Sequence, residues 1–211
     1  MHRLTAPFAV LVLAAIAAPL QSADKKMMIP EEGTLEIILL RQKSVRDELK
    51  INDATDAKIK EYSTRQWKKA QEVADHSQAE QDREFDAMAK ENEKFLDTTL
   101  SKEQRARLHQ IVLQQAGLLY VTRTDIALML KLTEEQKEQA RKAQKEARAE
   151  LEELLDAKDA KERQEKLAEL HKTNTQRLTS LFTPQQSAQW KQMIGAPFTG
   201  EFKFSTTAGG N

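Results

Sequence analysis

The sequence contains no cysteine and is poor in glycine, proline and aromatic residues. Without thiols the chain forms no disulfide, no thiolate nucleophile and no cysteine-ligated metal centre. Six glycines and five prolines among 211 residues are too few for the turns of a β-sandwich. They also leave little material for a glycine-rich phosphate-binding loop. These absences predict an all-α protein that is stabilised by helix packing alone.

Neither sign of charge is in excess, because 33 Lys and Arg balance 33 Asp and Glu. This balance argues against broad electrostatic attraction to nucleic acid or to an anionic membrane, so we expect no nucleic-acid partner. Charged residues make up 31% of the chain and hydrophobic residues 39%. The high charge content predicts long helices around a thin core.

Residues 1–23 have the features of a secretory signal peptide. A short basic start precedes an apolar run at 8–20, and Ser22 and Ala23 precede a charged stretch. The apolar run is too short for a confident membrane-spanning helix. We therefore expect a periplasmic or secreted protein without stable membrane insertion after cleavage near Ser22 or Ala23. The alternative is an uncleaved membrane anchor.

Two long stretches, 53–98 and 134–181, contain apolar residues at helical spacing and neither glycine nor proline. Each would span about 70 Å as one helix, so either the protein is elongated or each stretch bends or breaks once. The predicted organisation is 1–23 signal peptide, 24–43 polar leader and short helix, 44–117 first helical repeat, 118–195 second helical repeat and 196–211 flexible tail.

Shorter helices are predicted around the two long stretches. Residues 102–116 predict a helix that ends at Gly117, followed by an apolar connection at 118–123. A short helix is expected from 124 to 130. A last helix is expected to begin at Pro184 and to end at Gly195.

A five-residue pattern recurs where helices are expected to begin: an apolar residue, Ser or Thr, two polar residues, and Gln. Such spacing is typical of a capping box, in which the hydroxyl and the glutamine each bond a free N–H group of the other residue. Each cap contributes on the order of 1 kcal/mol. The copies are Leu100, Ser101 and Gln104; Leu132, Thr133 and Gln136; Phe182, Thr183 and Gln186; and a weaker one at Ile51 to Thr55.

The spacing of these copies indicates an internal duplication. Ile51 precedes Leu100 by 49 residues, and Leu132 precedes Phe182 by 50. The first copies of the two pairs, Ile51 and Leu132, lie 81 residues apart, and the second copies, Leu100 and Phe182, lie 82 apart. We therefore predict an elongated all-α bundle of alternating short and long helices, duplicated with a period of about 81 residues. The alternative is that long helical stretches align with one another by chance.

The intact copy, Leu132-Thr133-Glu134-Glu135-Gln136, resembles the repeated Leu-Thr-x-x-Gln motif of Spy/CpxP-like periplasmic proteins. As a pattern the resemblance covers most of residues 44–195. It implies a non-catalytic envelope protein, such as an ATP-independent chaperone or a modulator of envelope stress. The family's chaperones are small dimeric cradles, whereas this chain has four copies of the motif rather than two. The resemblance therefore implies a fused pseudo-dimer.

No motif predicts a catalytic, cofactor or metal site. His76, His109 and His171 are not spaced for shared metal ligation, and no metalloprotease or serine-hydrolase motif is present. We expect no enzyme. Apolar residues that thin helices leave uncovered are candidates for binding partners, with ordinary core positions as the alternative. These candidates are Trp67, Phe85, Met88, Leu119, Tyr120 and Met129.

The first functional prediction is an exported helical protein that binds other proteins, either unfolded clients or further copies of itself as a homo-oligomer. One alternative is a structural or assembly protein without client activity. The other is a metal-responsive sensor.

Overall fold

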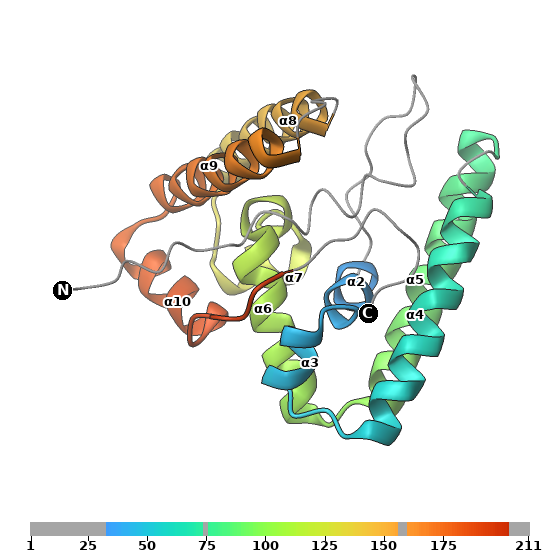
Figure 1. Cartoon of the computed structure of the whole chain (residues 1–211). Coiled ribbons are helices and arrows are strands. Elements are labelled where there is room, and N and C mark those ends of the chain that lie inside the picture. Colours follow the sequence, from blue (N-terminus) through green and yellow to red (C-terminus); the bar gives the residue numbers. More distant parts are fainter. Residues whose placement is uncertain (1–32, 74–75, 156–159, 203–211) are drawn as a thin grey trace. The chain divides into compact units, whose positions relative to one another are not determined.

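The computed structural model describes residues 33–73, 76–155 and 160–202, and all regular elements in this part are helices (Figure 1). The predicted all-α class is confirmed for these residues. The predicted signal peptide and residues 203–211 of the predicted tail lie outside them. The helices are α2 (Thr34–Leu40), α3 (Lys43–Glu48), α4 (Asp53–Val73), α5 (Gln78–Thr99), α6 (Lys102–Tyr120), α7 (Thr124–Met129), α8 (Glu134–Leu155), α9 (Ala160–Ser180) and α10 (Pro184–Ile194).

The chain folds into two compact units, and Leu113 is the first residue of the second unit in the described part. The first unit contains α2 to α5 and the beginning of α6, and the second contains the end of α6 with α7 to α10. No described helix is long and apolar enough to cross a membrane.

Each of the two predicted long stretches, 53–98 and 134–181, forms two helices instead of one. The expected alternative of a single break in each stretch is therefore confirmed. In the first unit α4 and α5 pack side by side, and in the second unit α8 and α9 do so (Figure 1). Small side chains on α8 allow the close approach of α9, because Ala140 and Ala147 are both buried. Each hairpin therefore buries a narrow apolar seam and exposes a charged outer face.

Helix α6 was predicted to end at Gly117; its helical geometry breaks next to this residue, and a further helical segment then continues to Tyr120. The backbone departs from helical geometry at Ala116, with φ −121° and ψ 19°. A Cβ atom added to Gly117 would lie 2.8 Å from the ring of Trp190. Glycine at this position therefore also allows close packing on α10. The predicted apolar connection is partly helical and buried, with Leu118 4% exposed.

The described part of the predicted flexible tail is held by the rest of the chain. The Phe198 N–H donates to Gln114 Oε1 at 2.8 Å, and Gln114 Nε2 donates to the carbonyls of Ile194 and Ala196. Phe202 is also buried.

Helices of the two halves begin at matching intervals. Starts of α3 and α7, and of α4 and α8, lie 81 residues apart, and starts of α5 and α9, and of α6 and α10, lie 82 apart. Lys50 and Lys131 follow α3 and α7 with φ of 52° and 51°. The residue after each lysine donates its backbone N–H to the carbonyl five residues earlier, at 3.0 Å. Ile51 donates to Arg46, and Leu132 donates to Ala127. Both short helices therefore end in the same type of left-handed turn.

Candidate functional site

The Leu-Thr-x-x-Gln copies cap helices in the way their spacing predicts. The Gln136 N–H donates to Thr133 Oγ1 at 3.1 Å, and the Thr133 N–H donates to Gln136 Oε1 at 3.0 Å. The same pair of bonds joins Ser101 with Gln104 and Thr183 with Gln186. The apolar residues Leu100 and Leu132 are buried, and Phe182 is half-buried.

The free amide nitrogen of each glutamine makes a second, long-range contact. Gln104 Nε2 donates to the Leu49 carbonyl at 3.0 Å, and Gln186 Nε2 donates to the Leu130 carbonyl at 3.1 Å. Both carbonyls belong to the residue at which a short helix, α3 or α7, ends. The motif therefore ties the start of one helix to the end of another.

The second unit has an additional link between two motif copies. Gln136 and Gln186 exchange amide hydrogen bonds of 2.8 Å and 3.0 Å. The position in the first unit that matches Gln136 is Thr55, whose N–H is bonded by the side chain of Asn52 instead. Gln189 also donates to the Met129 carbonyl. The end of α7 is therefore held by amides from α10.

This held helix carries the exposed large hydrophobic residues of the described chain. Leu128 is 71% exposed and Met129 is 53% exposed, whereas Ile126 and Ala127 on the same helix are buried. We call Leu128 and Met129 the α7 pair. Met129 is among the predicted partner-binding residues, but the sequence reasoning did not select Leu128.

Comparison of α7 with α3 shows how unusual the pair is. The positions that match Leu128 and Met129 in α3, 81 residues earlier, are Asp47 and Glu48. Both carboxylates form ion pairs of 2.7 Å, Asp47 with Lys43 and Glu48 with Arg107. The positions that match Lys43 and Arg107 carry the uncharged residues Thr124 and Gln189. Aligning the two halves at their motifs is the sequence signal that could have identified Leu128.

The other predicted partner-binding residues lie in two different units. Met88 in the first unit and Leu119 and Tyr120 in the second are buried, so a partner reaches them only if the packing changes. Trp67 and Phe85 in the first unit are half-buried, and the Arg41 guanidinium lies 4.6 Å from the centre of the Trp67 ring.

The described residues include no group of three or more His, Asp and Glu side chains arranged to hold a metal ion. His171 instead belongs to the packing of the second unit. Its Nε2 lies 3.2 Å from the Gln114 carbonyl oxygen, and burial lowers the pKa of the imidazole.

We expect the free energy of unfolding to decrease as the pH falls below about 6.5, the ordinary pKa of histidine. The unfolded state takes up a proton there, and the half-buried His171, whose pKa is lowered in the folded state, resists it, so protonation favours unfolding. Urea denaturation at about pH 7.5 and 5.5 measures this difference. The variant His171→Gln keeps a hydrogen-bond donor and is expected to reduce the difference. An unchanged difference would mean that other groups cause the pH dependence.

Comparison of the chain with protein-family models, curated proteins and solved structures finds no match. The resemblance to Spy/CpxP-like proteins therefore depends on the motif residues and their spacing.

Proposed function

We propose that this chain is an exported, non-catalytic helical protein that binds another protein through helix α7. The observation that carries the proposal is the exposure of Leu128 and Met129, at 71% and 53%. When apolar side chains are held on a fixed backbone, the backbone itself loses little conformational entropy as a partner covers them. Amides from α10 hold this backbone at the Met129 and Leu130 carbonyls.

The chemistry around the α7 pair favours an uncharged apolar segment as its occupant. Gln189 bonds α7 and lies on the same face of α10 as Gln185 and Gln192, with spacings of four and three residues. Amide side chains both donate and accept hydrogen bonds, so they can bond the main chain of an extended segment. Two side chains provide far less than the roughly 800 Å² that each partner buries in a stable interface. A short segment fits this area better than a large folded surface.

We further infer that the chain arose by internal duplication with a period of about 81 residues. Matching helix starts, the matching turns at Lys50 and Lys131, and the matching bonds of Gln104 and Gln186 support this inference. On this basis the second half exchanged one exposed and one partly buried ion pair for the α7 pair. Loss of the exposed pair of Asp47 with Lys43 costs little stability.

The motif copies and the predicted signal peptide support placing the chain among Spy/CpxP-like envelope proteins. Within that class, the apolar occupant would be a segment of an unfolded client. The polar, ion-paired exterior elsewhere supports the alternative of a structural or assembly protein. Examples are the bidentate pair of Arg177 with Glu150 and the pair of Arg105 with Glu93, all at 2.8 Å.

The proposal is tested by giving α7 the residues of α3. The variant Leu128→Asp with Met129→Glu replaces the apolar pair by two carboxylates and keeps Gln189, which bonds the Met129 carbonyl. Light scattering measures how an equimolar amount of the full chain slows the aggregation of reduced, unfolded lysozyme. We expect the variant to be at least tenfold less effective, because the loss of one apolar contact alone exceeds about 1.4 kcal/mol.

A matched control adds two negative charges elsewhere on the second unit. Gln139→Glu with Ala149→Asp alters two exposed positions of α8 and is expected to leave the suppression unchanged. Equal suppression by the α7 variant and the original chain would remove α7 from the binding site. No suppression by the original chain would favour the structural alternative.

A further inference from the structure

We propose that Met129 is a site of oxidation by hydrogen peroxide, and that the resulting sulfoxide switches off binding through α7. The first half of this inference concerns only the exposure of the thioether. The second half rests on the proposed function and names its regulation.

Sulfur in this protein occurs only in its six methionines, because the chain has no cysteine. Three methionines lie in the described residues. Met88 is 5% exposed and Met193 is half-buried, whereas Met129 is 53% exposed. Susceptibility of a thioether to dissolved oxidant increases with its exposure. Met129 is therefore expected to react first among these three.

The reaction is a two-electron oxygen transfer that needs only the peroxide. The sulfur lone pair of Met129 attacks one peroxide oxygen, and the O–O bond breaks as the S–O bond forms. Sulfur is oxidised, peroxide is reduced, and the departing hydroxide takes the proton from the new S–OH group, which leaves the sulfoxide and one water molecule. The product is a polar sulfoxide in place of an apolar thioether.

The position of Met129 confines the effect to the surface. Its side chain is exposed, and its carbonyl is bonded by Gln189, so the backbone of α7 has a partner that oxidation leaves intact. Oxidation therefore changes the α7 pair without removing a core contact. Leu128 is inert to peroxide and remains beside the sulfoxide, but half of the pair becomes polar. An apolar client segment bound at the α7 pair would lose its apolar contact with the Met129 side chain.

The test exposes the purified full chain to hydrogen peroxide and follows each methionine by mass spectrometry of its peptides. We expect Met129 to gain an oxygen atom about tenfold faster than Met88. The chain oxidised at Met129 is then assayed with reduced, unfolded lysozyme, and its suppression of aggregation is expected to decrease about tenfold. Circular dichroism checks that the helix content is unchanged.

Met129→Leu provides the matched control. This variant carries an apolar side chain that peroxide does not oxidise, so its suppression of aggregation is expected to be the same before and after peroxide treatment. Oxidation of Met88 as fast as Met129 would overturn the site. Full activity of the sulfoxide form, together with loss of activity in the variant Leu128→Asp, would overturn the switch. Failure of the untreated chain to act on lysozyme would refute the proposed function and the switch, but not the order of oxidation.

Discussion

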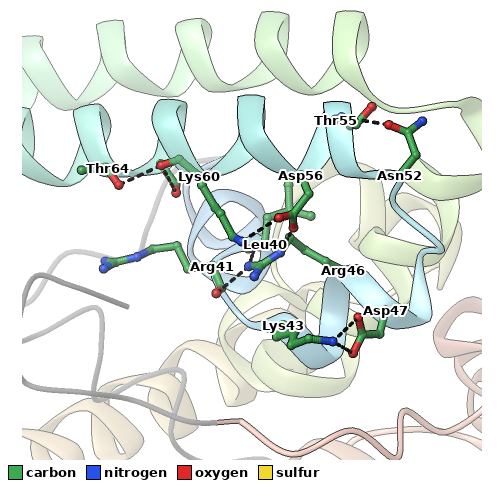
Figure 2. A network of polar contacts seen from close by, with 11 residues as sticks. Leu40, Arg41, Lys43, Arg46, Asp47, Asn52, Thr55, Asp56, Lys60 and Thr64 are labelled. Atoms are coloured by element: carbon green, nitrogen blue, oxygen red, sulfur yellow. Dashed lines mark hydrogen bonds and ion pairs between the residues drawn. The ribbon is translucent and has the colours of Figure 1, made fainter. Parts of the chain in front are cut away.

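Replacing Asp56 with alanine is expected to lower the free energy of unfolding by about 2–4 kcal/mol. The Asp56 carboxylate forms an ion pair with Arg46 Nε, and the Arg46 side chain is only 5% exposed. Arg46 Nη1 also donates to the carbonyls of Leu40 and Arg41, each at 2.7 Å (Figure 2). Without Asp56 the buried Arg46 guanidinium keeps its hydrogen bonds to these two carbonyls but loses the opposite charge beside it. Urea denaturation of the full chain, followed by circular dichroism, measures the loss.

The neighbouring helix α3 supplies the control for this prediction. Asp47 pairs with Lys43 at 2.7 Å, but their side chains are 60% and 75% exposed (Figure 2). Asp47→Ala is expected to cost less than about 0.5 kcal/mol, because exposed ion pairs contribute little. Arg46→Met combined with Asp56→Ala is expected to be more stable than Asp56→Ala alone, since no buried charge remains. Equal effects of Asp47→Ala and Asp56→Ala would contradict the argument.

The same ion pair predicts a response to acid. The hydrogen bond from Lys60 and the nearby Arg46 guanidinium lower the pKa of Asp56 below its ordinary 3.8. The folded state therefore binds the proton more weakly than the unfolded state. The stabilisation that this carboxylate contributes is complete above about pH 3.8, and it is lost as the pH falls through the lowered pKa of the folded state. Asp56→Ala is expected to remove this part of the acid sensitivity.

Replacing Gln186 with glutamate is expected to lower the free energy of unfolding by about 2–4 kcal/mol, in proportion to the number of buried bonds lost. Gln186 is 8% exposed and donates to the Leu130 carbonyl and to Gln136 Oε1. A carboxylate can still accept the Thr183 N–H, so the capping acceptor survives. It cannot donate, however, and it places a negative charge against two oxygen atoms. Denaturation in urea measures the change in stability.

Two further measurements distinguish the loss of the Gln186 amide donor from a general packing defect. Protonation of the new carboxyl group supplies an O–H donor, so the deficit relative to the original chain is expected to shrink towards about pH 4. Amide hydrogen exchange in α7 is expected to accelerate at neutral pH, because the end of this helix loses a donor. A deficit that does not change with pH would indicate a packing defect instead.

Gln104→Glu is the matched control in the first unit. Gln104 is less buried than Gln186, and its amide nitrogen donates to the single carbonyl of Leu49. We expect a smaller loss of stability than at Gln186. A larger loss in the first unit would mean that the link between Gln136 and Gln186 is not what stabilises the second.

Local sequence patterns predicted the helix starts and their caps well. Thr183 and Pro184 begin α10, and Gly195 ends it with φ 63°. These features depend on residues within a few positions of one another, so the sequence contains the information needed to identify them. The break in helical geometry at Ala116 agrees with the predicted stop at Gly117, but the packing of Gly117 against Trp190 was not predictable, because Trp190 is distant in the sequence.

The candidate site was only partly predictable for a similar reason. Met129 was selected with Met88 and Tyr120 because all three are large apolar or aromatic residues that thin helices were expected to leave uncovered. The structure exposes Met129 and buries the other two. Hydrophobic periodicity indicates which residues share a face, but a short helix such as α7 has too few residues to show which face is covered.

The amino-acid sequence by itself determined the all-helical class, the capping residues and the repeated spacing, because these follow from composition and from contacts within one helical turn. Tertiary structure alone decided the partners of the free glutamine amides and the exposure of the α7 pair. Gln136 meets Gln186 across 50 residues of sequence, and Leu128 stays uncovered on the outer side of α7. Such long-range contacts depend on how whole helices pack, which no local pattern encodes.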